Sequence, residues 1–303
     1  MNKRLAAGLA IFLALFGLSF FSGRIAPHEQ GYTKSVTENM VDGKKVVVMA
    51  PEAPGANFVL GSDGWGRDLA SEMLHGLPWT LAIVFVTGAF RCVIGLGAGL
   101  VMGSSGGSGR KAKRAGFSPL SAIPSFLIAA FILYPVTINS TLPSFGLFAF
   151  QAAVLIFVEI APVTASFASR TALILEQPFV EAVRAAGASR RWILRYHVLP
   201  FIAADFIEAI PVQALSVAAM VGKLGIVKLF IGGTVRSFSP IIETSARSEW
   251  LGLLGNYLDS MYTAPWLVIA PFAGWLLILA CTRLLAAGLK ESLAGTKRLA
   301  VAA

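Results

Sequence analysis

Long apolar segments alternate with shorter polar ones along the whole chain. A helix needs about 20 predominantly apolar residues to cross the hydrocarbon core of a bilayer, and its backbone groups are then hydrogen-bonded within the segment. Runs of this kind predict membrane-spanning helices. Six spans are predicted, at approximately 5–21, 77–102, 117–136, 145–168, 201–221 and 265–287.

The first span stands apart from the other five. It follows two basic residues and resembles a secretory signal peptide, but its apolar run is long for one and no small-x-small cleavage site precedes Arg24. We therefore favour a retained transmembrane anchor over 1–22. A polar, extracytoplasmic segment is expected over 23–76, and the alternation of residues at 45–49 predicts a short strand within it.

The other five spans form a predicted helical core over 77–290. A basic loop at 170–200 and a second extracytoplasmic segment at 222–263 interrupt this core, and a short basic tail at 291–303 follows it on the cytoplasmic side. The predicted fold class is an all-α, polytopic membrane protein with about six transmembrane helices.

The composition agrees with this fold class. Of the 303 residues, 56% are hydrophobic and only 14% are charged, whereas soluble domains carry roughly 25% charged residues. The net charge of +9 would suit nucleic-acid binding, but the basic residues sit at the ends of the apolar segments and not on one polar face. They are better interpreted as topology signals, so no nucleic-acid partner is expected.

Those basic residues predict the orientation of the chain. With the N-terminus in the cytoplasm, 15 Lys or Arg residues lie inside and nine outside, while three acidic residues lie inside and ten outside. The short inner loops, where the positive-inside rule holds best, both favour this arrangement. We expect a multi-pass protein of the cell membrane (plasma or inner), surrounded by lipid, with both termini and the 170–200 loop in the cytoplasm.

No motif for nucleotide binding or metal-dependent catalysis occurs in the sequence. The glycine-rich run at 103–109 leads into a basic turn at 110–114 and lacks the Lys-Ser/Thr ending of a phosphate-binding loop, so it is interpreted as a linker. Cys92 and Cys281 lie inside apolar segments without ligand-like spacing, and neither a disulfide nor a metal site is predicted. No nucleophile–base pair is recognisable. We expect a chain that is not an enzyme and that takes energy from a partner or an ion gradient.

One loop carries the strongest functional signal. The stretch 181–187 reads Glu-Ala-Val-Arg-Ala-Ala-Gly and runs on through basic residues to Leu199 and Pro200. Glycine allows one helix to end and another to begin at an angle. Because alanine carries little side-chain bulk, another protein could approach the backbone closely. The pattern predicts a docking hairpin at the membrane surface; the alternatives are an ordinary cytoplasmic loop, or a docking element for assembly or signalling alone.

Two further stretches combine with this hairpin. Gly-Ser-Asp-Gly-Trp-Gly-Arg-Asp at 61–68 precedes the second span, and Glu-Trp-Leu-Gly at 249–252 is followed by Thr-Ala-Pro-Trp at 263–266. In this order, with one span far ahead of the other five, the chain resembles the peptide/nickel-type permeases of binding-protein-dependent ABC importers. Within them it is most similar to the C-type subunit of dipeptide and oligopeptide systems, over about 61–293.

The resemblance implies the transmembrane subunit of a type I importer and assigns a role to the hairpin. In that family the loop is the coupling helix, which sits in a groove of the ATP-binding subunit. The corresponding residues, including the two that close the loop, are Glu181, Ala182, Val183, Arg184, Ala185, Ala186, Gly187, Ala188, Ser189, Leu199 and Pro200.

The resemblance also implies partners. The family usually combines two different permeases, here a hetero-dimer that forms the translocation path, with two ATP-binding subunits and an extracytoplasmic substrate-binding protein. ATP and Mg would be bound by the ATPase chains, and this chain would bind no cofactor itself. Specificity usually resides in the binding protein, so peptides, nickel complexes and other small solutes all remain open as substrates.

The chain departs from the family pattern in places. Val183 stands where a third small residue is usual, and Phe201 replaces the asparagine that commonly follows Leu-Pro. The segment 223–233 is only distantly related to the Leu-Ser-Phe-Leu-Gly-Leu-Gly-like segment that often follows the fifth span. These differences leave the coupling role intact but weaken any inference about the substrate.

Acidic residues in or near the predicted spans are further candidates. A carboxylate at the centre of a span needs a partner or a wet cavity. Glu159 could line the translocation path, but we favour an intramembrane pair with Arg91, the basic residue inside the second span. Asp205 and Glu208, three apart on one helical face, are expected to face water or the basic hairpin. The alternative function is an ion-coupled secondary transporter that relays protons through these three acids, although no internal repeat supports it.

The remaining motif residues have both structural and functional interpretations. Asp63 and Asp68 are good turn and cap residues and Arg67 could pair with them, so bracing of the second span is favoured over contact with a binding protein. Two explanations account equally well for the basic residues Arg190, Arg191 and Arg195. They could contact acidic residues of an ATPase, or they could serve only to set the membrane topology.

Overall fold

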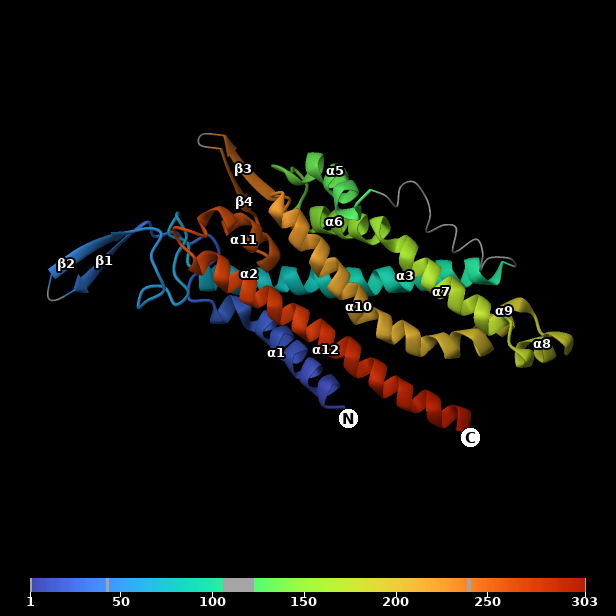
Figure 1. The fold of residues 1–303 in the computed structure, drawn as a ribbon. Coiled ribbons are helices and arrows are strands. Elements are labelled where there is room, and N and C mark those ends of the chain that lie inside the picture. Colours follow the sequence, from blue (N-terminus) through green and yellow to red (C-terminus); the bar gives the residue numbers. More distant parts are fainter. Residues whose placement is uncertain (1, 42–43, 106–122, 239–240, 303) are drawn as a thin grey trace.

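The computed structural model describes residues 2–41, 44–105, 123–238 and 241–302. It shows long helices packed side by side in an elongated bundle (Figure 1). Helices account for the described parts of every predicted span, so the chain has the predicted helical, polytopic fold.

Four helical segments are long and apolar enough to cross a membrane by themselves: Lys3–Ile25, Leu69–Ser104, Arg190–Ile226 and Trp266–Leu293. Two of these segments, Leu69–Ser104 and Arg190–Ile226, each consist of several consecutive helical elements. In each, a π-helical turn changes the hydrogen-bond pattern without ending the helix. In chain order these elements are α1 (Lys3–Ile25), α2 (Leu69–Leu81), η1 (Ala82–Val86), α3 (Thr87–Ser104), α9 (Arg190–Ile193), η3 (Leu194–Val198), α10 (Leu199–Ile226) and α12 (Trp266–Ala302).

A bent pair of helices is together long and apolar enough for one further span. α6 (Ser144–Val158) and α7 (Ile160–Leu175) meet at an angle of 50°. The predicted third span corresponds to α5 (Ser125–Thr137), which is apolar but only 13 residues long. The first part of that predicted span and the basic turn at 110–114 lie outside the described residues.

The second span begins earlier than its apolar run. α2 starts at Leu69 and not at residue 77, because the Asp68 carboxylate accepts hydrogen bonds from the N–H groups of Ala70 at 3.3 Å and Ser71 at 3.1 Å. Glu72, in the first turn, is buried against protein and not exposed to lipid, so hydropathy alone does not mark this turn as helical. The predicted segment 23–76 therefore ends inside a helix.

The predicted loop at 170–200 is reduced to the connection 176–189. Leu199 and Pro200, expected to close the loop, instead lie inside the continuous helix Arg190–Ile226. The π-helical turn η3 directly precedes Pro200 and accommodates its ring, which excludes a regular helical hydrogen bond.

The two ends of the chain lie along each other. α12 continues to Ala302, so the expected tail at 291–303 is part of this helix over its described residues. α1 packs along α12, and Gly8 lies so close that a Cβ there would be 2.8 Å from the backbone nitrogen of Leu285. Small residues allow membrane helices to approach in this way.

Two β-hairpins extend from the helices. β1 (Val36–Val41) pairs antiparallel with β2 (Lys44–Met49), so the strand predicted at 45–49 is present. A second hairpin, β3 (Thr234–Phe238) with β4 (Ile241–Ser245), lies in the polar segment after α10 and is not indicated by the sequence pattern.

The polar segments expected outside the cell and the loop expected inside it lie at opposite ends of the bundle. α11 (Trp250–Tyr257) and the 3₁₀ helix η4 (Leu258–Ser260) connect β4 to α12. Figure 1 shows α11 and the β1–β2 hairpin at one end, and α8 (Pro178–Ala185) with α9 at the other.

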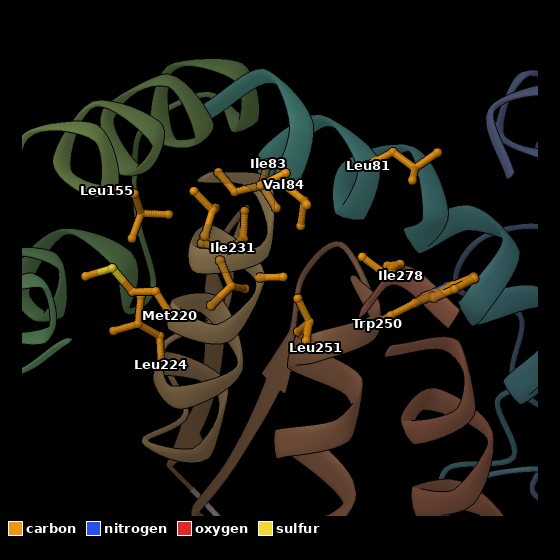
Figure 2. Packing of buried hydrophobic residues seen from close by; sticks show 14 of the residues in the cluster. Leu81, Ile83, Val84, Leu155, Met220, Leu224, Ile231, Trp250, Leu251 and Ile278 are labelled. Atoms are coloured by element: carbon orange, nitrogen blue, oxygen red, sulfur yellow. The ribbon is translucent and has the colours of Figure 1, made fainter. Parts of the chain in front are cut away.

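Segments far apart in the sequence meet in the main apolar core (Figure 2). In lipid such contacts stabilise mainly through close packing, because lipid tails are as apolar as the side chains. The labelled members of the cluster come from α2, η1, α6, α10, the segment after it, α11 and α12: Leu81, Ile83, Val84, Leu155, Met220, Leu224, Ile231, Trp250, Leu251 and Ile278.

Candidate functional site

The loop expected to dock an ATPase is a hairpin of two short helices. α8 begins at Pro178, which suits a first helical turn because no N–H donor is needed there. Gly187 has a φ of +89°, which residues with a side chain rarely adopt. Its N–H donates to the carbonyl of Arg184 at 3.0 Å, and the N–H of Ala188 donates to Val183 at 3.3 Å. This pair of bonds is a Schellman turn, so the predicted glycine break is present.

Ser189 starts the second arm of the hairpin. Its hydroxyl oxygen accepts a hydrogen bond from the N–H of Trp192 at 3.4 Å and caps α9. α9 continues through η3 into α10, so the hairpin joins α7 directly to another long helix. A displacement of the hairpin therefore acts on two membrane helices.

An apolar inner face anchors the hairpin to the bundle. Val180 is completely buried and Ile193 nearly so. Both belong to a cluster whose other buried members, from α7, η3 and α10, are Val163, Phe167, Val198 and Ile202. Val183 packs against the same cluster, which gives this departure from the family pattern a structural role. The spacing of three between Val180 and Val183 is the signal by which sequence reasoning could have found this inner face.

The outward face of the hairpin is exposed. Alanine and glycine dominate it, so the backbone is open to close approach by another protein. Of the predicted coupling residues in the connection, Val183 and Ala188 are half-buried, and those exposed are Glu181, Ala182, Arg184, Ala185, Ala186, Gly187 and Ser189.

Basic and aromatic side chains flank this outward face. Trp192 and Tyr196 are about half exposed. The guanidinium carbon of Arg195 lies 5.8 Å from the ring centre of Tyr196. Arg190 and Arg191 are exposed as well. Aromatic and arginine side chains are common both at protein interfaces and at the membrane surface, so contact with an ATPase and topology both agree with this exposure.

Arg91 and Glu159 meet within the bundle. Nη1 of Arg91 lies 2.9 Å from Oε2 of Glu159; the arginine side chain is fully buried and the glutamate side chain is 23% exposed. The ion pair favoured from the sequence is therefore present. Its place is not predicted, because Glu159 lies at the break between α6 and α7 and not within a continuous span.

Asp205 and Glu208 lie toward the hairpin end of α10. Nε of Arg170, which lies on α7, is 3.1 Å from Oδ2 of Asp205. Both acids line a cavity of about 550 Å³, together with Arg170 and Lys290. Glu159 is paired with Arg91 and Asp205 with Arg170, and Gln213, which lines the same cavity as Asp205 and Glu208, accepts a hydrogen bond from Arg91.

The motif at 61–68 forms a tight turn at the opposite end of the bundle. Asp63 accepts hydrogen bonds at 2.9 Å from the N–H groups of Trp65 and Arg67, and Nε of Arg67 donates back to Asp63 at 2.7 Å. Asp68 caps α2. The turn and the helix cap expected from the sequence are present; Arg67 pairs with Asp63, whereas Asp68 lies 3.3 Å from Nδ1 of His28.

Residues from much later in the chain contact this turn and the helix that follows it. The indole nitrogen of Trp266 donates to the carbonyl of Ser62 at 3.3 Å, and the Tyr257 hydroxyl donates to Asp63 at 3.1 Å. Ser248 donates to the buried Glu72 of α2. Residues 61–68 and 263–266 are thus in direct contact, and Ser248, just before the stretch 249–252, contacts the helix that follows the turn. Spacing along the chain does not reveal these contacts.

Glu249 begins α11 and is completely buried. One oxygen of its carboxyl group accepts a hydrogen bond from the N–H of Leu251 at 2.9 Å, which caps the helix. Burial raises the pKa of Glu249 to about 7, although backbone N–H groups oppose this shift. Burial likewise raises the pKa of the nearby Tyr257 hydroxyl well above its ordinary value, so this group stays protonated and donates to Asp63.

Cysteine and metal chemistry play no visible part in either cluster. Cys92 and Cys281 are free and buried. Among the described residues, no group of three or more His, Cys, Asp or Glu side chains is placed to hold a metal ion.

Long apolar helices and an exposed hairpin at one end of the bundle define the chain as a helical, multi-pass membrane protein. It belongs to the family of binding-protein-dependent transport system inner membrane components, the permeases of ABC importers, and that family matches residues 95–294. The matched part contains most of α3, the helix break at Glu159 and the whole hairpin.

Relatives agree with this assignment. The chain is 30% identical over 239 residues to the peptide transport system permease protein SapC of Escherichia coli O6:H1, covering 78% of this chain and 73% of the relative. It is 28% identical over 299 residues to the di/tripeptide transport system permease protein DppC of Pseudomonas aeruginosa, covering 96% and 88%. The oligopeptide transport system permease protein OppC of Haemophilus influenzae is 28% identical over 250 residues, covering 80% and 72%.

The family predicted from three short motifs is therefore confirmed, and with it the function of a transmembrane permease subunit of an ABC importer. These relatives are permease subunits and not enzymes. A permease of this kind acts in a transport complex with other subunits.

Proposed function

We propose that this chain is the C-type permease of a peptide importer. It forms the translocation path with a second, different permease and couples to two ATP-binding subunits through the hairpin at 181–189. An extracytoplasmic binding protein delivers the substrate. ATP and Mg are bound by the ATPase chains, and this chain contributes no catalytic residue and binds no cofactor.

The geometry of the hairpin is the observation that carries this proposal. Its inner face is fixed by Val180 and Ile193, and its outer face presents small exposed residues beside Glu181 and Arg184. Because the inner face of the hairpin is packed against the bundle, a displacement of the outer face moves the hairpin as a unit and is transmitted to the attached helices. Both ends of the hairpin lead directly into membrane helices.

The orientation with both termini in the cytoplasm is part of the proposal. The hairpin lies at one end of the bundle, and the ordered polar cluster around Asp63 lies with α11 toward the other (Figure 1). Only one of these ends can face cytoplasmic ATPases, and the excess of basic residues assigns that side to the hairpin.

Peptides are the proposed substrate class because the relatives that cover most of this chain are named for peptide, oligopeptide and di/tripeptide transport. The ion-coupled alternative has no structural support. Asp205 is paired with Arg170, and Glu159 is paired with Arg91.

Purification of the membrane-extracted chain with its bound partners tests the complex. We expect a second permease and ATP-binding subunits to accompany it. In a variant with Cys92 and Cys281 replaced by alanine, Ala185→Cys is expected to cross-link to an ATPase. Trp65→Cys, half exposed at the other end of the bundle, is the matched control and is expected not to do so. A solitary chain that takes up substrate in ATP-free vesicles would contradict the proposal.

A further inference from the structure

The helical segment formed by α6 and α7 is interrupted at one residue, Glu159. Glu159 has φ −115° and ψ 20°, outside the helical range, and the two helices meet at 50°. Pro162 explains the position of the break. It has no N–H to donate to the carbonyl of Val158, and its ring would collide with that carbonyl in a straight helix. The local sequence therefore determines that a bend occurs here, but not its angle.

The Glu159 carboxylate connects the break to three other helices. Its Oε1 accepts a hydrogen bond from the hydroxyl of Ser125 on α5 at 2.7 Å. Its Oε2 accepts from Arg91 on α3 at 2.9 Å and from the hydroxyl of Ser216 on α10 at 2.7 Å. An ionised group inside the membrane is tolerated when it is fully partnered in this way. The bend angle is therefore set by tertiary contacts.

Arg91 contacts both the end of α6 and the residue at the break. Its Nη1 pairs with Glu159, and its Nη2 donates to the carbonyl of Leu155 in the last turn of α6. The last carbonyls of a helix lack partners within the helix, and a positive charge is favourable beside them. Nη1 also lies 3.2 Å from the amide oxygen of Gln213 on α10. We call Arg91, Ser125, Glu159, Gln213 and Ser216 the elbow cluster.

α7 connects the elbow cluster to the hairpin as a rigid rod. α7 lies flush against α3, where Cβ atoms built on Gly95 and Gly99 would be 2.7 Å from Val163 and 2.6 Å from Phe167. Its 16 residues span about 24 Å at 1.5 Å per residue. Two residues, Glu176 and Gln177, then lead into α8, and their N–H groups bond back to α7. A displacement of α8 is thus carried to Glu159 without a flexible link.

We propose that Arg91 and Glu159 are positioning residues of the transport cycle: they convert displacement of the docked hairpin into a change of the α6–α7 angle. They do this by attaching to α3 the residue at which α6 ends and α7 begins, and they do not contact the substrate. This inference rests on the proposed coupling role of the hairpin. Because Ser125 and Ser216 tie the same carboxylate to α5 and α10, a change of angle also shifts those two helices.

Three variants of the assembled transporter in lipid nanodiscs test the elbow cluster. Glu159→Gln keeps the shape and can still accept hydrogen bonds, but it loses the charge that holds Arg91. We expect its ATPase rate to stay within about twofold of wild type, while the number of substrate molecules transported per ATP falls about tenfold. Arg91→Lys is expected to behave similarly, because a single ammonium cannot reach both Glu159 and Leu155.

Ser216→Ala keeps the assay informative if either charge variant fails to assemble. It removes one hydroxyl and leaves the ion pair, so we expect a two- to threefold loss of transport per ATP. Ser104→Ala is the matched control, because within the described part of the chain the hydroxyl of Ser104 bonds to Val101 of its own helix, and it is expected to leave this ratio unchanged.

A distance measurement separates positioning from a merely structural role. Spin labels at Phe145→Cys on α6 and Leu173→Cys on α7, both exposed positions, report the angle of the elbow. Without added nucleotide we expect one narrow distance distribution in the otherwise wild-type transporter, and a second, shifted one with trapped nucleotide. In Glu159→Gln we expect one broad distribution that nucleotide does not shift. A structural role alone would lower assembly and thermal stability but leave the response to nucleotide intact.

The possible failures are distinguishable. Wild-type transport per ATP and wild-type distances in both Glu159→Gln and Ser216→Ala would overturn the elbow role. Absence of ATPase subunits from the purified complex, together with no cross-link at Ala185→Cys, would instead overturn the proposed function on which it rests.

Discussion

The indole nitrogen of Trp250 donates a hydrogen bond to the backbone carbonyl of Met73 at 2.7 Å and so fastens α11 to α2. The ring of Trp250 is almost completely buried, and a Cβ on Gly274 of α12 would lie 2.5 Å from it. One side chain therefore links three elements at the end of the bundle opposite to the hairpin. The Glu-Trp-Leu-Gly motif is explained by this contact together with the cap at Glu249.

Replacement of Trp250 should destabilise this end of the molecule. Trp250→Ala leaves a large cavity between α11 and α12 and is expected to lower the free energy of unfolding by about 3–5 kcal/mol. Trp250→Phe keeps most of the volume and loses the bond to Met73, so a loss of about 1 kcal/mol is expected. Thermal unfolding of the detergent-solubilised protein measures both. Trp65→Ala, at a half-exposed tryptophan, is the control, and an equal loss there would contradict the prediction.

Gly187→Val should impair coupling. Valine at φ +89° costs about 1–2 kcal/mol, so the Schellman turn distorts and the outer face of the hairpin shifts. If this free-energy cost of about 1–2 kcal/mol appears in the docking equilibrium, docking becomes roughly tenfold weaker. We expect transport to fall about tenfold while the chain still inserts in the membrane.

Gly31→Val provides the matched control for this change. Gly31 also has a positive φ, +87°, and open space around its Cα, but it lies in the polar segment after α1. Transport should remain near wild type in this variant. Equal losses in both variants, measured with purified complexes of equal subunit composition, would assign the effect to general backbone strain and not to docking.

The buried Glu249 predicts that stability falls as pH rises. Its pKa is raised from 4.5 to about 7 in the folded chain, so the carboxyl is protonated in both states below the lower value and ionised in both above the higher one. The stabilisation is fully present below about pH 4.5 and is lost as pH rises through about 7. At about 1.4 kcal/mol per pKa unit, the shift corresponds to about 3 kcal/mol.

Thermal unfolding between pH 5 and pH 8 measures this contribution. Glu249→Gln cannot titrate but can still accept the hydrogen bond from Leu251, so its melting temperature is expected to depend less on pH than that of the wild type. The exposed Glu29→Gln should leave the wild-type dependence unchanged. A Glu249→Gln profile as steep as the wild type would show that another group titrates.

Close packing of α3 on α7 should not tolerate side chains. In Gly99→Leu, even the Cβ would lie 2.6 Å from Phe167 and 3.0 Å from the backbone of Ala168, so the two helices must separate. We expect a loss of stability of at least 1–3 kcal/mol, as for other overpacked sites, and a strong loss of transport. Gly97→Leu is the control because nothing lies within 4 Å of its Cβ position. Similar yields and melting temperatures for the two variants would contradict the packing argument.

Local sequence determined much of this protein. Apolar runs indicated the approximate place of the long helices, although six spans were predicted and the described residues contain four such helices, or five with the bent pair α6–α7. Gly187 determined the break in the hairpin and Asp68 a helix start, because each depends on neighbouring residues. The family could also be predicted from the sequence, since its three motifs are short and contiguous.

Tertiary structure decided the rest. Hydropathy did not predict that α2 starts at Leu69, because the first turn contains Glu72, whose burial depends on Ser248, a residue far along the chain. The ion pair of Arg91 with Glu159 could be inferred because a buried charge needs a partner, but its position on a helix break, with Ser125 and Ser216 as further partners, required the packing of four segments. Sequence specifies which groups need partners; only the fold brings those partners, distant in the chain, within hydrogen-bonding distance.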